Sequence, residues 1–517
     1  MQKFHRFFLH FFELCFDCAR LELKKHGSEF QKSSKQRKEC LMKTTRLKSF
    51  CLIIVLILAT GAAMAYSTGA AKSWLAGWTR PQLQNPRVNS LPVTLSGRLV
   101  QNKVLQGSDG RVNLSLTLRV SDDLVSDIST PTNVDMVIVL DRSGSMNGRK
   151  ISDARQAVLN LLSSLSAKDR LALITYSDGV QVVSGLQRVT AEHRQRLEAL
   201  ISSVTAGGAT NLGAGLLAGM DVILSAADMG NTAKLILISD GLANKGITDS
   251  ARLSSMASTA VEKEFVVSTI GVGHDFNERL MTAIADHGAG NYYYLEDPQT
   301  FAEVFQKEFG YTKATVATNV SVALQLGNGI SLVDAAGYPV SIEKNRSVFY
   351  PGNLRAGQTR KLFLTLQVPT AAIKSFEIGT VKVRYRFSGR PMETALNGAF
   401  EIACVENPKE VEASIDEASW ADKVIQEDYN RLKQAVAADI KAGEKEKALL
   451  RIKNYHHEQE AINAAIKSEK VSQNLERDLK DLQQTVEDSF SGAPAAAAEK
   501  QKSNAKALQY EGYSGRR

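Results

Sequence analysis

The sequence predicts a doubly wound α/β domain with a mostly parallel sheet, inserted in a β-sandwich and followed by an α-helical C-terminal domain. Two patterns indicate this fold class. In residues 133–309, continuous apolar runs alternate with helical patterns, which is typical of parallel strands buried on both faces. On both sides of this stretch, apolar and polar residues alternate strictly, as in strands with one buried face. We therefore expect one interrupted sandwich; two unrelated β pieces are the alternative.

The first 65 residues supply most of the net positive charge of the chain. They hold 12 Lys and Arg against 5 Asp and Glu, so they supply +7 of the formal net charge of +8. Residues 42–65 contain a basic segment, the apolar run FCLIIVLIL and a final A-x-A pattern, which is the order of a cleavable signal peptide. The composition of residues 1–41 predicts no core, and we interpret them as a gene-model extension ahead of a start at Met42; an unusually long leader is the alternative. We expect export to a periplasm or cell envelope; an uncleaved N-terminal membrane anchor is the alternative.

The rest of the chain is almost neutral, with 51 basic and 50 acidic side chains. This balance gives no electrostatic footprint for a phosphate backbone, so we expect no nucleic-acid partner. Four of the five cysteines lie before residue 66, and Cys404 alone can form no internal disulfide. Cys15 and Cys18 have the spacing of a redox or zinc pair, but the sequence contains no second pair.

The elements can be assigned in chain order. Residues 66–90 are rich in Gly, Ala, Pro and Asn and are interpreted as a linker. Residues 91–132 and 310–405 carry the alternating patterns and form the two parts of the sandwich. Within residues 133–309, strands are predicted at VDMVIVL, RLALITYS, AKLILISD and FVVSTIGVG. Helices are predicted between and after these strands, near residues 151–165, 191–204, 212–226, 250–261 and 278–287.

The C-terminal third has helical periodicity. Within residues 406–490, apolar residues at helical spacing predict three amphipathic helices, with a break at Gly443, and favour a small antiparallel bundle or hairpin. Heptad-like spacing leaves a coiled-coil arm, and therefore an oligomer, as the alternative. Residues 491–517 have little apolar content, and we expect a mobile tail there.

One loop at a strand end carries the strongest chemical signal. The run VIVL ends at Asp141, and Ser143 and Ser145 occupy the next two alternate positions. Thr210 lies in GGATN, and Asp240 ends the run LILISD. The carboxyl ends of parallel strands border one crevice, and hydroxyl and carboxylate oxygens with room for water suit Mg²⁺ or Mn²⁺. Capping of the following helix by Asp141 and the serines is the alternative, but it leaves Thr210 and Asp240 unexplained.

The stretches DRSGSM, GGATN and ISDG together resemble the metal-ion-dependent adhesion site of the von Willebrand factor type A family. All positions of the family pattern are present, and the surrounding residues resemble bacterial exported members. The resemblance implies that Ser143, Ser145 and in some members Thr210 bind the metal directly, while Asp141 and Asp240 act through water or hydrogen bonds. It also implies a partner protein that presents Asp or Glu to the open coordination position.

Enzymatic chemistry is not indicated. Ser143 stands where a haloacid-type phosphatase has its second carboxylate, neither serine lies in a G-x-S-x-G motif, and the sequence has no Walker-type loop. His456, His457 and Glu460 have a spacing that permits zinc on a helix, but no third protein ligand is identified. We therefore expect an exported, non-enzymatic, divalent-metal-dependent protein-binding module. The alternative is an envelope assembly or scaffolding protein in which the metal is structural.

Overall fold

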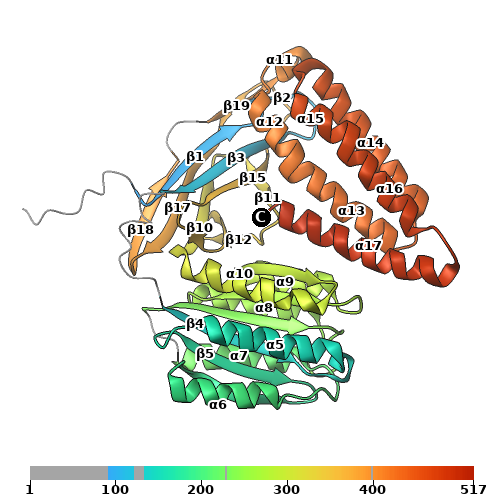
Figure 1. Cartoon of the computed structure of the whole chain (residues 1–517). Helices are drawn as coiled ribbons and strands as arrows, with labels where there is room; N and C mark the ends of the chain where they lie inside the picture. Colours follow the sequence, from blue (N-terminus) through green and yellow to red (C-terminus); the bar gives the residue numbers. More distant parts are fainter. Residues whose placement is uncertain (1–90, 122–132, 227–229, 397–399) are drawn as a thin grey trace, which may run out of the picture. The chain divides into compact units, whose positions relative to one another are not determined.

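The computed structural model describes residues 91–121, 133–226, 230–396 and 400–517. The predicted signal peptide, the residues ahead of it and the linker up to residue 90 lie outside the described residues. Within the described ranges, no helix combines the length and the apolar character that are needed to cross a membrane. The predicted fold class is confirmed, because the chain contains an α/β domain, flanking β-sheets and a C-terminal helical region (Figure 1).

The α/β domain has a six-stranded sheet. Its strands are β4 (Val134–Asp141), β5 (Arg170–Tyr176), β6 (Val180–Arg188), β7 (Thr232–Ser239), β8 (Val266–Val272) and β9 (Ala289–Leu295). They lie in the order β6-β5-β4-β7-β8-β9. All neighbouring pairs are parallel except β5 and β6. Every residue of β4, β7 and β8 is buried, which explains their continuous apolar runs.

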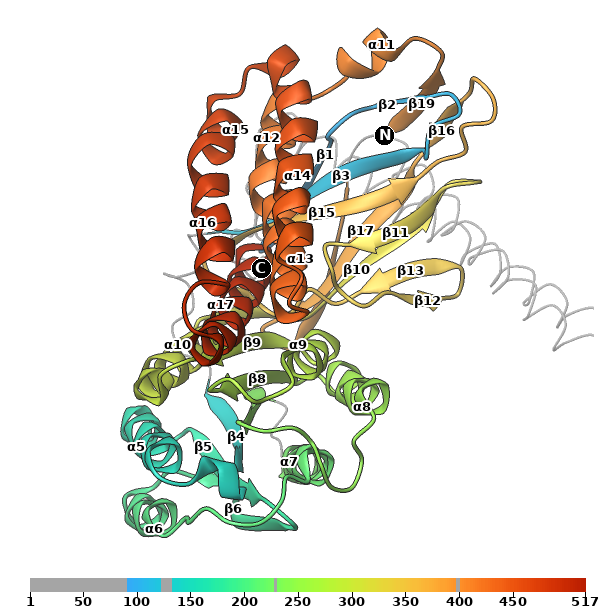
Figure 2. The same cartoon turned by 90° about the vertical axis from the view of Figure 1, so that its right-hand side faces the viewer.

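Helices cover both faces of this sheet. They are α5 (Arg149–Ser164), α6 (Ala191–Ser202), α7 (Leu212–Ala226), α8 (Ser250–Glu262), α9 (Glu278–His287) and α10 (Phe301–Lys313). Figure 2 shows α5, α6 and α10 on one face and α7, α8 and α9 on the other. Short 3₁₀ turns, η1 (Gly144–Met146) and η2 (Pro298–Thr300), precede α5 and α10. This doubly wound arrangement places the carboxyl ends of β4 and β7 side by side at one edge of the sheet.

Strands on both sides of the α/β domain form the sandwich. They are β1 (Val93–Leu99), β2 (Lys103–Leu105), β3 (Arg111–Val120), β10 (Thr315–Leu326), β11 (Ser331–Ala335), β12 (Ser341–Glu343), β13 (Arg346–Phe349), β14 (Leu354–Arg355), β15 (Thr359–Gln367), β16 (Ser375–Glu377), β17 (Gly379–Phe387), β18 (Arg390–Ala395) and β19 (Glu401–Val405). One sheet has the order β1-β3-β15-β11 and the other β12-β13-β10-β17-β18, with β14 on β10. A small sheet has the order β16-β19-β2.

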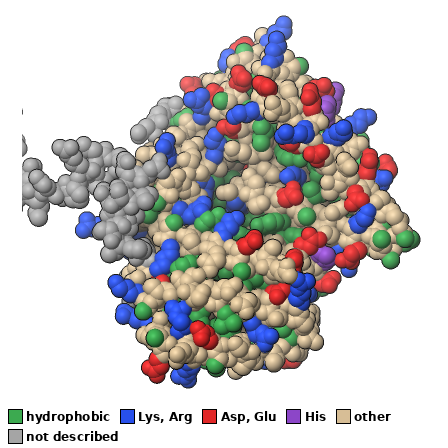
Figure 3. Space-filling model, in the orientation of Figure 1, with side chains coloured by type: hydrophobic (Ala, Val, Ile, Leu, Met, Phe, Trp, Pro, Cys, Tyr) green, Lys and Arg blue, Asp and Glu red, His purple; other side chains and the backbone are tan. Residues whose placement is uncertain are grey.

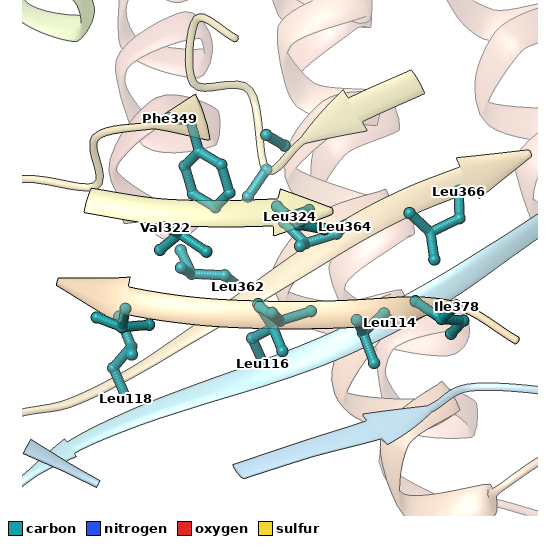
Figure 4. Packing of buried hydrophobic residues seen from close by; sticks show 14 of the residues in the cluster. Leu114, Leu116, Leu118, Val322, Leu324, Phe349, Leu362, Leu364, Leu366 and Ile378 are labelled. Carbon is teal, nitrogen blue, oxygen red and sulfur yellow. The ribbon is translucent and has the colours of Figure 1, made fainter. Parts of the chain in front are cut away.

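The pairing of β3 with β15 joins the two halves of the sandwich across the inserted domain. These strands are antiparallel, with Leu114 opposite Leu364 and Leu116 opposite Leu362. The pairing excludes the alternative of two unrelated β pieces. In Figure 4 the alternating leucines of β3 and β15 and the apolar side chains of β10 gather between the sheets. Leu114, Leu116 and Leu118 are fully buried, as their alternation with polar residues predicts.

The C-terminal region contains more helix than the sequence pattern predicted. Its elements are α11 (Pro408–Glu412), α12 (Glu417–Lys423), η3 (Val424–Asp428), α13 (Tyr429–Lys441), α14 (Lys445–Ile466), α15 (Glu469–Gln473), η4 (Asn474–Asp478), α16 (Leu479–Ser489) and α17 (Pro494–Gly515). The segments η3 and η4 are single π-helical stretches that continue the helices before and after them. Trp420, Val436, Ile452, Val471 and Val486 share one apolar cluster within the chain, which favours a bundle over a coiled-coil arm.

The prediction of a mobile tail at residues 491–517 is wrong. α17 packs along α13 in Figure 1, and its side chains Leu508 and Tyr513 are buried. The segment is rich in Ala, Lys and Gln, which favour helices, so low apolar content did not imply mobility. Gly512 permits the close approach, because a Cβ at this position would lie 2.5 Å from the Asn430 carbonyl oxygen.

We expect Gly512→Ala to lower the free energy of unfolding by about 1–3 kcal/mol, because the added methyl group overpacks the contact between α13 and α17. Urea unfolding followed by circular dichroism measures this change. Gly310→Ala is the matched control, since a Cβ at Gly310 in α10 meets no atom within 4 Å. This control should leave stability unchanged or raise it by up to about 1 kcal/mol. A silent Gly512→Ala would contradict the packing of α17.

Candidate functional site

The candidate site lies where β4 ends. The strand is buried throughout and stops at Asp141, which is 0% exposed. The chain then turns through Ser143 into η1, and the fully buried Met146 anchors this turn in the core beneath α5. Gly148 precedes α5 with a φ of +80°, a conformation that glycine adopts without strain. The turn therefore holds Ser143 and Ser145 at the edge of the sheet.

A second loop is fastened to the first through backbone hydrogen bonds. Gly144 N donates to Gly208 O at 2.9 Å, and Gly207 N donates to Arg142 O at 2.7 Å. Gly208 has a φ of +89°, and a Cβ there would lie 2.2 Å from an Asp178 carboxylate oxygen, so only glycine fits. These contacts bring the GGATN loop beside the DRSGSM loop.

Side-chain oxygens from the loops that follow β4 and β7 form one hydrogen-bonded group. Ser145 Oγ donates to Asp240 Oδ1 at 2.7 Å, and the hydroxyls of Ser143 and Ser145 are 3.0 Å apart. Thr210 belongs to the same cluster, because a Cβ added at Gly241 would lie 3.4 Å from Ser145 Oγ and 3.5 Å from Thr210 Oγ1. The structure thus brings all the predicted site residues together.

Asp141 lies beneath this group and orients it. Its Oδ1 accepts a hydrogen bond from Ser143 N at 2.8 Å, and its Oδ2 accepts one from Ser239 Oγ at 3.0 Å. Burial raises the pKa of Asp141 from 3.8 to about 6; hydrogen bonds from Ser143 and Ser239 oppose this shift, and the nearby charge of Asp240 adds to it. Among the described residues, no cation forms an ion pair with Asp141. The carboxylate is therefore left under-compensated.

Lys150 supplies the positive charge at the exposed side of the group. Its Nζ lies 2.6 Å from Asp240 Oδ2, and its side chain is 28% exposed, whereas that of Asp240 is 0% exposed. The ammonium group thus sits beside the same carboxylate that accepts from Ser145. A lysine in the first turn of a helix opposes the helix dipole, so the contact with Asp240 compensates an otherwise unfavourable position.

The donor set fits a hard divalent cation. Mg²⁺ and Mn²⁺ prefer hydroxyl, carboxylate and water oxygens. Ser145 donates its one hydroxyl hydrogen to Asp240 and accepts a hydrogen bond from Ser143, so one lone pair of its oxygen remains to face a cation. The candidate ligands are Ser143, Ser145 and Thr210, while Asp141 and Asp240 are placed to accept hydrogen bonds from them or from metal-bound water.

Sequence reasoning missed three residues of this site. Ser239 was read as part of an apolar strand, although it is the one hydroxyl near the end of that run and its side chain reaches Asp141. The sequence gives no signal for Asn244, whose Oδ1 accepts a hydrogen bond from Thr210 N at 2.8 Å and fixes the second loop. The sequence could have indicated a role for Lys150, because two adjacent basic residues at the start of a helix are unfavourable unless a carboxylate lies nearby.

The other sequence candidates lie elsewhere. His456 contacts Glu460 at 3.5 Å on an exposed face of α14. Within residues 91–121, 133–226, 230–396 and 400–517, no group of three or more His, Cys, Asp or Glu side chains is placed to hold a metal. Cys404 is buried and reduced. On the face in Figure 3, basic and acidic side chains are interspersed and form no large single-sign field.

Residues 135–307 match the family model of the von Willebrand factor type A domain. The chain therefore contains such a domain, a class that commonly mediates protein–protein interaction and adhesion and often binds a divalent metal. Proteins of this class are mostly non-enzymatic interaction modules, although some are E3 ubiquitin ligases.

Two curated relatives each match about a third of this chain. The chain is 33% identical to the uncharacterized protein YfbK of Escherichia coli (strain K12) over 196 residues, which is 37% of this chain and 33% of that protein. It is 30% identical to inter-alpha-trypsin inhibitor heavy chain H3 of Mesocricetus auratus over 172 residues, 32% of this chain and 19% of that protein. The matches thus span about a third or less of each relative.

A solved structure resembles more of the chain. The von Willebrand factor type A protein from Catenulispora acidiphila has a TM-score of 0.62 at 19% identity and covers 82% of this chain and 97% of that one. At this identity the likeness concerns the fold alone. It extends beyond residues 135–307, so the flanking elements share the likeness.

The raised pKa of Asp141 predicts a pH-dependent stability in metal-free buffer. Because the folded-state pKa lies above the unfolded value, this group stabilises the fold below pH 3.8, and that contribution is lost as the pH rises through about 6. A shift from 3.8 to about 6 corresponds to about 3 kcal/mol at neutral pH.

We expect Asp141→Asn to lose less stability than the wild type between pH 4 and pH 7, as measured by urea unfolding. Asp221→Asn, at an exposed position of α7, is the control, and an unchanged pH slope in Asp141→Asn would refute the assignment.

Lys150 predicts a competition at Asp240. If a divalent cation binds beside this carboxylate, the ammonium group has to yield or be repelled, so we expect Lys150→Met to bind Mg²⁺ several-fold more tightly. Isothermal titration calorimetry measures the affinity. Lys168→Met, on an exposed loop, is the control for a general change of charge. Weaker Mg²⁺ binding by Lys150→Met would show that the lysine organises the site rather than competes for it.

Proposed function

We propose that the protein is an exported, divalent-metal-dependent protein-binding module. In this proposal, the DRSGSM and GGATN loops hold Mg²⁺ or Mn²⁺ through Ser143, Ser145 and Thr210, and the site captures an Asp or Glu side chain of a partner protein. The observation that carries the proposal is the hydrogen-bonded group of Ser143, Ser145 and Asp240 at the edge of the sheet, with Thr210 beside it.

The chemistry follows from the neutrality of the candidate ligands. A bound divalent ion would supply positive charge that is only weakly compensated by hydroxyls and water, and would attract a partner's carboxylate. The chain's own part is to hold the oxygens in place. Asp141 accepts a hydrogen bond from Ser143 N and fixes that backbone, and Asp240 accepts a hydrogen bond from Ser145 Oγ, so the Ser145 oxygen stays oriented as an acceptor.

Export is supported by residues 42–65, whose pattern is that of a signal peptide. The lone cysteine after residue 65 suits an oxidising periplasm or cell envelope, because it can form no internal disulfide. The match to an Escherichia coli protein is compatible with a bacterial envelope protein. We propose a protein partner, and membrane attachment only if the signal segment is retained.

The scaffolding alternative draws on the burial of both carboxylates. Asp141 and Asp240 are 0% exposed and connect β4 and β7 with the loops that follow them, so a metal at this position would also stabilise the domain. In that case the metal would act on the fold rather than on a partner.

A thermal melt of residues 66–517 with Mg²⁺ or Mn²⁺ tests the metal site. A ligand at about 100 times its dissociation constant adds roughly 2.7 kcal/mol, so the wild type should melt at a higher temperature with metal than with chelator. Ser143→Ala should lose most of this gain. Ser163→Ala, at an exposed position of α5, should keep it. An equal metal response in all three proteins would contradict the site.

Partner capture separates binding from scaffolding. We expect the wild type to retain an envelope protein in Mg²⁺ and to release it in chelator, and Asp240→Ala to lose this capture while it still folds. Co-purification from envelope extracts, combined with the melting temperature of each variant, measures both quantities. If Asp240→Ala loses partner capture only to the extent that its melting temperature falls, the result would favour the scaffolding function.

A further inference from the structure

A cavity of about 220 Å³ lies at the amino-terminal ends of the strands of the α/β sheet, whereas the candidate metal site lies at their carboxyl ends. It is bordered by the starts of β7 and β8, by β9 and by the end of α10. Loops of the sandwich and the end of α17 complete its wall. In Figure 2, α17 lies over β9, the edge strand of the sheet, close to α10. The cavity thus draws its residues from segments that are far apart in the sequence.

The wall of the cavity is basic and aromatic. Five cationic side chains border it, and no Asp or Glu does. They are Lys234, Lys307, Arg355, Arg360 and Arg517. Two of these cations form ion pairs with carboxylates that do not border the cavity. Lys234 Nζ lies 2.8 Å from Glu308 Oε2, and Arg517 pairs with Asp286.

The other three cations have no such compensation. Among the described residues, no carboxylate oxygen lies within 4.0 Å of the charged nitrogens of Lys307, Arg355 or Arg360. The Arg355 guanidinium carbon lies 3.6 Å from the centroid of the Tyr311 ring, and Lys307 Nζ lies 5.7 Å from it. These rings attract cations, but they do not neutralise them. The cavity therefore carries a surplus of positive charge.

Two polar groups in the wall are buried without a hydrogen-bond partner. Tyr292 is 1% exposed, and its hydroxyl has no partner among the described residues. Arg360 donates to the carbonyl oxygens of Pro351 and Asn353, yet its Nε is shielded from solvent and bonded to no described residue. A buried donor that is left unpaired destabilises the folded state, so two in one wall require an explanation.

We propose that this cavity binds a small oxyanion, the phosphate or carboxylate group of a small molecule. Arg355 would donate to the oxyanion through its guanidinium group, Arg360 through its unpaired Nε, and Tyr292 would donate a hydrogen bond from its hydroxyl. Guanidinium groups match phosphate and carboxylate because their planar forks donate parallel hydrogen bonds.

The size of the cavity limits the ligand. The cavity has a volume of about 220 Å³. Pockets for drug-sized ligands begin near 300 Å³, so the volume suits inorganic phosphate or a small organic acid better than a nucleotide. The tyrosine rings would exclude water around the ligand and strengthen the attraction of the cations. This site is separate from the proposed metal site and does not depend on it.

Calorimetric titration with inorganic phosphate and with succinate tests the proposal and distinguishes the two oxyanions. Residues 66–517 are titrated in metal-free Tris buffer at constant ionic strength, so that an anion cannot bind through a metal at the Asp141 loop. Saturable binding of at least one probe is expected. We expect Arg355→Gln to weaken it about tenfold or more, because a charge-assisted hydrogen bond is lost.

Tyr292→Phe separates a binding role from a structural one. Its hydroxyl has no partner among the described residues, so the variant should unfold at an unchanged or higher temperature and yet bind the anion several-fold more weakly. Arg390→Gln, an exposed arginine of β18, is the control and should bind like the wild type. The absence of saturable binding of both probes at millimolar concentrations would overturn the proposal. Equal weakening in Arg390→Gln and Arg355→Gln would also overturn it.

Discussion

The buried carboxylate of Asp141 is the constraint around which the candidate metal site is organised. It ends the central strand β4, accepts a hydrogen bond from the backbone that follows it, and accepts another from Ser239 on the neighbouring strand β7. A carboxylate at this depth is tolerated only when its oxygens are hydrogen-bonded. The same bonds that satisfy it therefore determine where Ser143 lies and align the DRSGSM loop with Asp240.

The two ends of the strands of the α/β sheet carry different kinds of side chain. At the carboxyl ends of its strands, hydroxyls and carboxylates from three loops converge. At the opposite edge, guanidinium and ammonium groups converge with tyrosine rings. The strand interiors between them are apolar, so neither polar group reaches the other through the core. The proposed cation site and the proposed anion site thus lie at opposite ends of the strands of this sheet, and loops of the sandwich and α17 complete the second.

Much of the fold and of the first site could be predicted from local patterns. Buried runs such as those of β4 and β7 and the strict alternation in β3 each define a strand within a single segment. The loop with Asp141, Ser143 and Ser145 is recognisable because its residues are close in the sequence. By contrast, α17 was misjudged because its helix depends on propensity and on contact with α13, and apolar content reports neither. The basic cavity combines residues as distant as Lys234, Arg360 and Tyr513, and no sequence spacing indicates such a meeting.

The junction between α10 and β10 has a mechanical consequence. α10 ends at Lys313 and β10 begins at Thr315, so Ala314 alone separates a helix of the α/β domain from a central strand of the sandwich. The carbonyl oxygen of Ala314 accepts a hydrogen bond from Ala356 N at 3.1 Å, which clamps the joint from the side. With a single connecting residue and this hydrogen bond, the chain has little freedom to bend between α10 and β10, so we expect a force applied to the α/β domain to be transmitted through α10 to the sandwich.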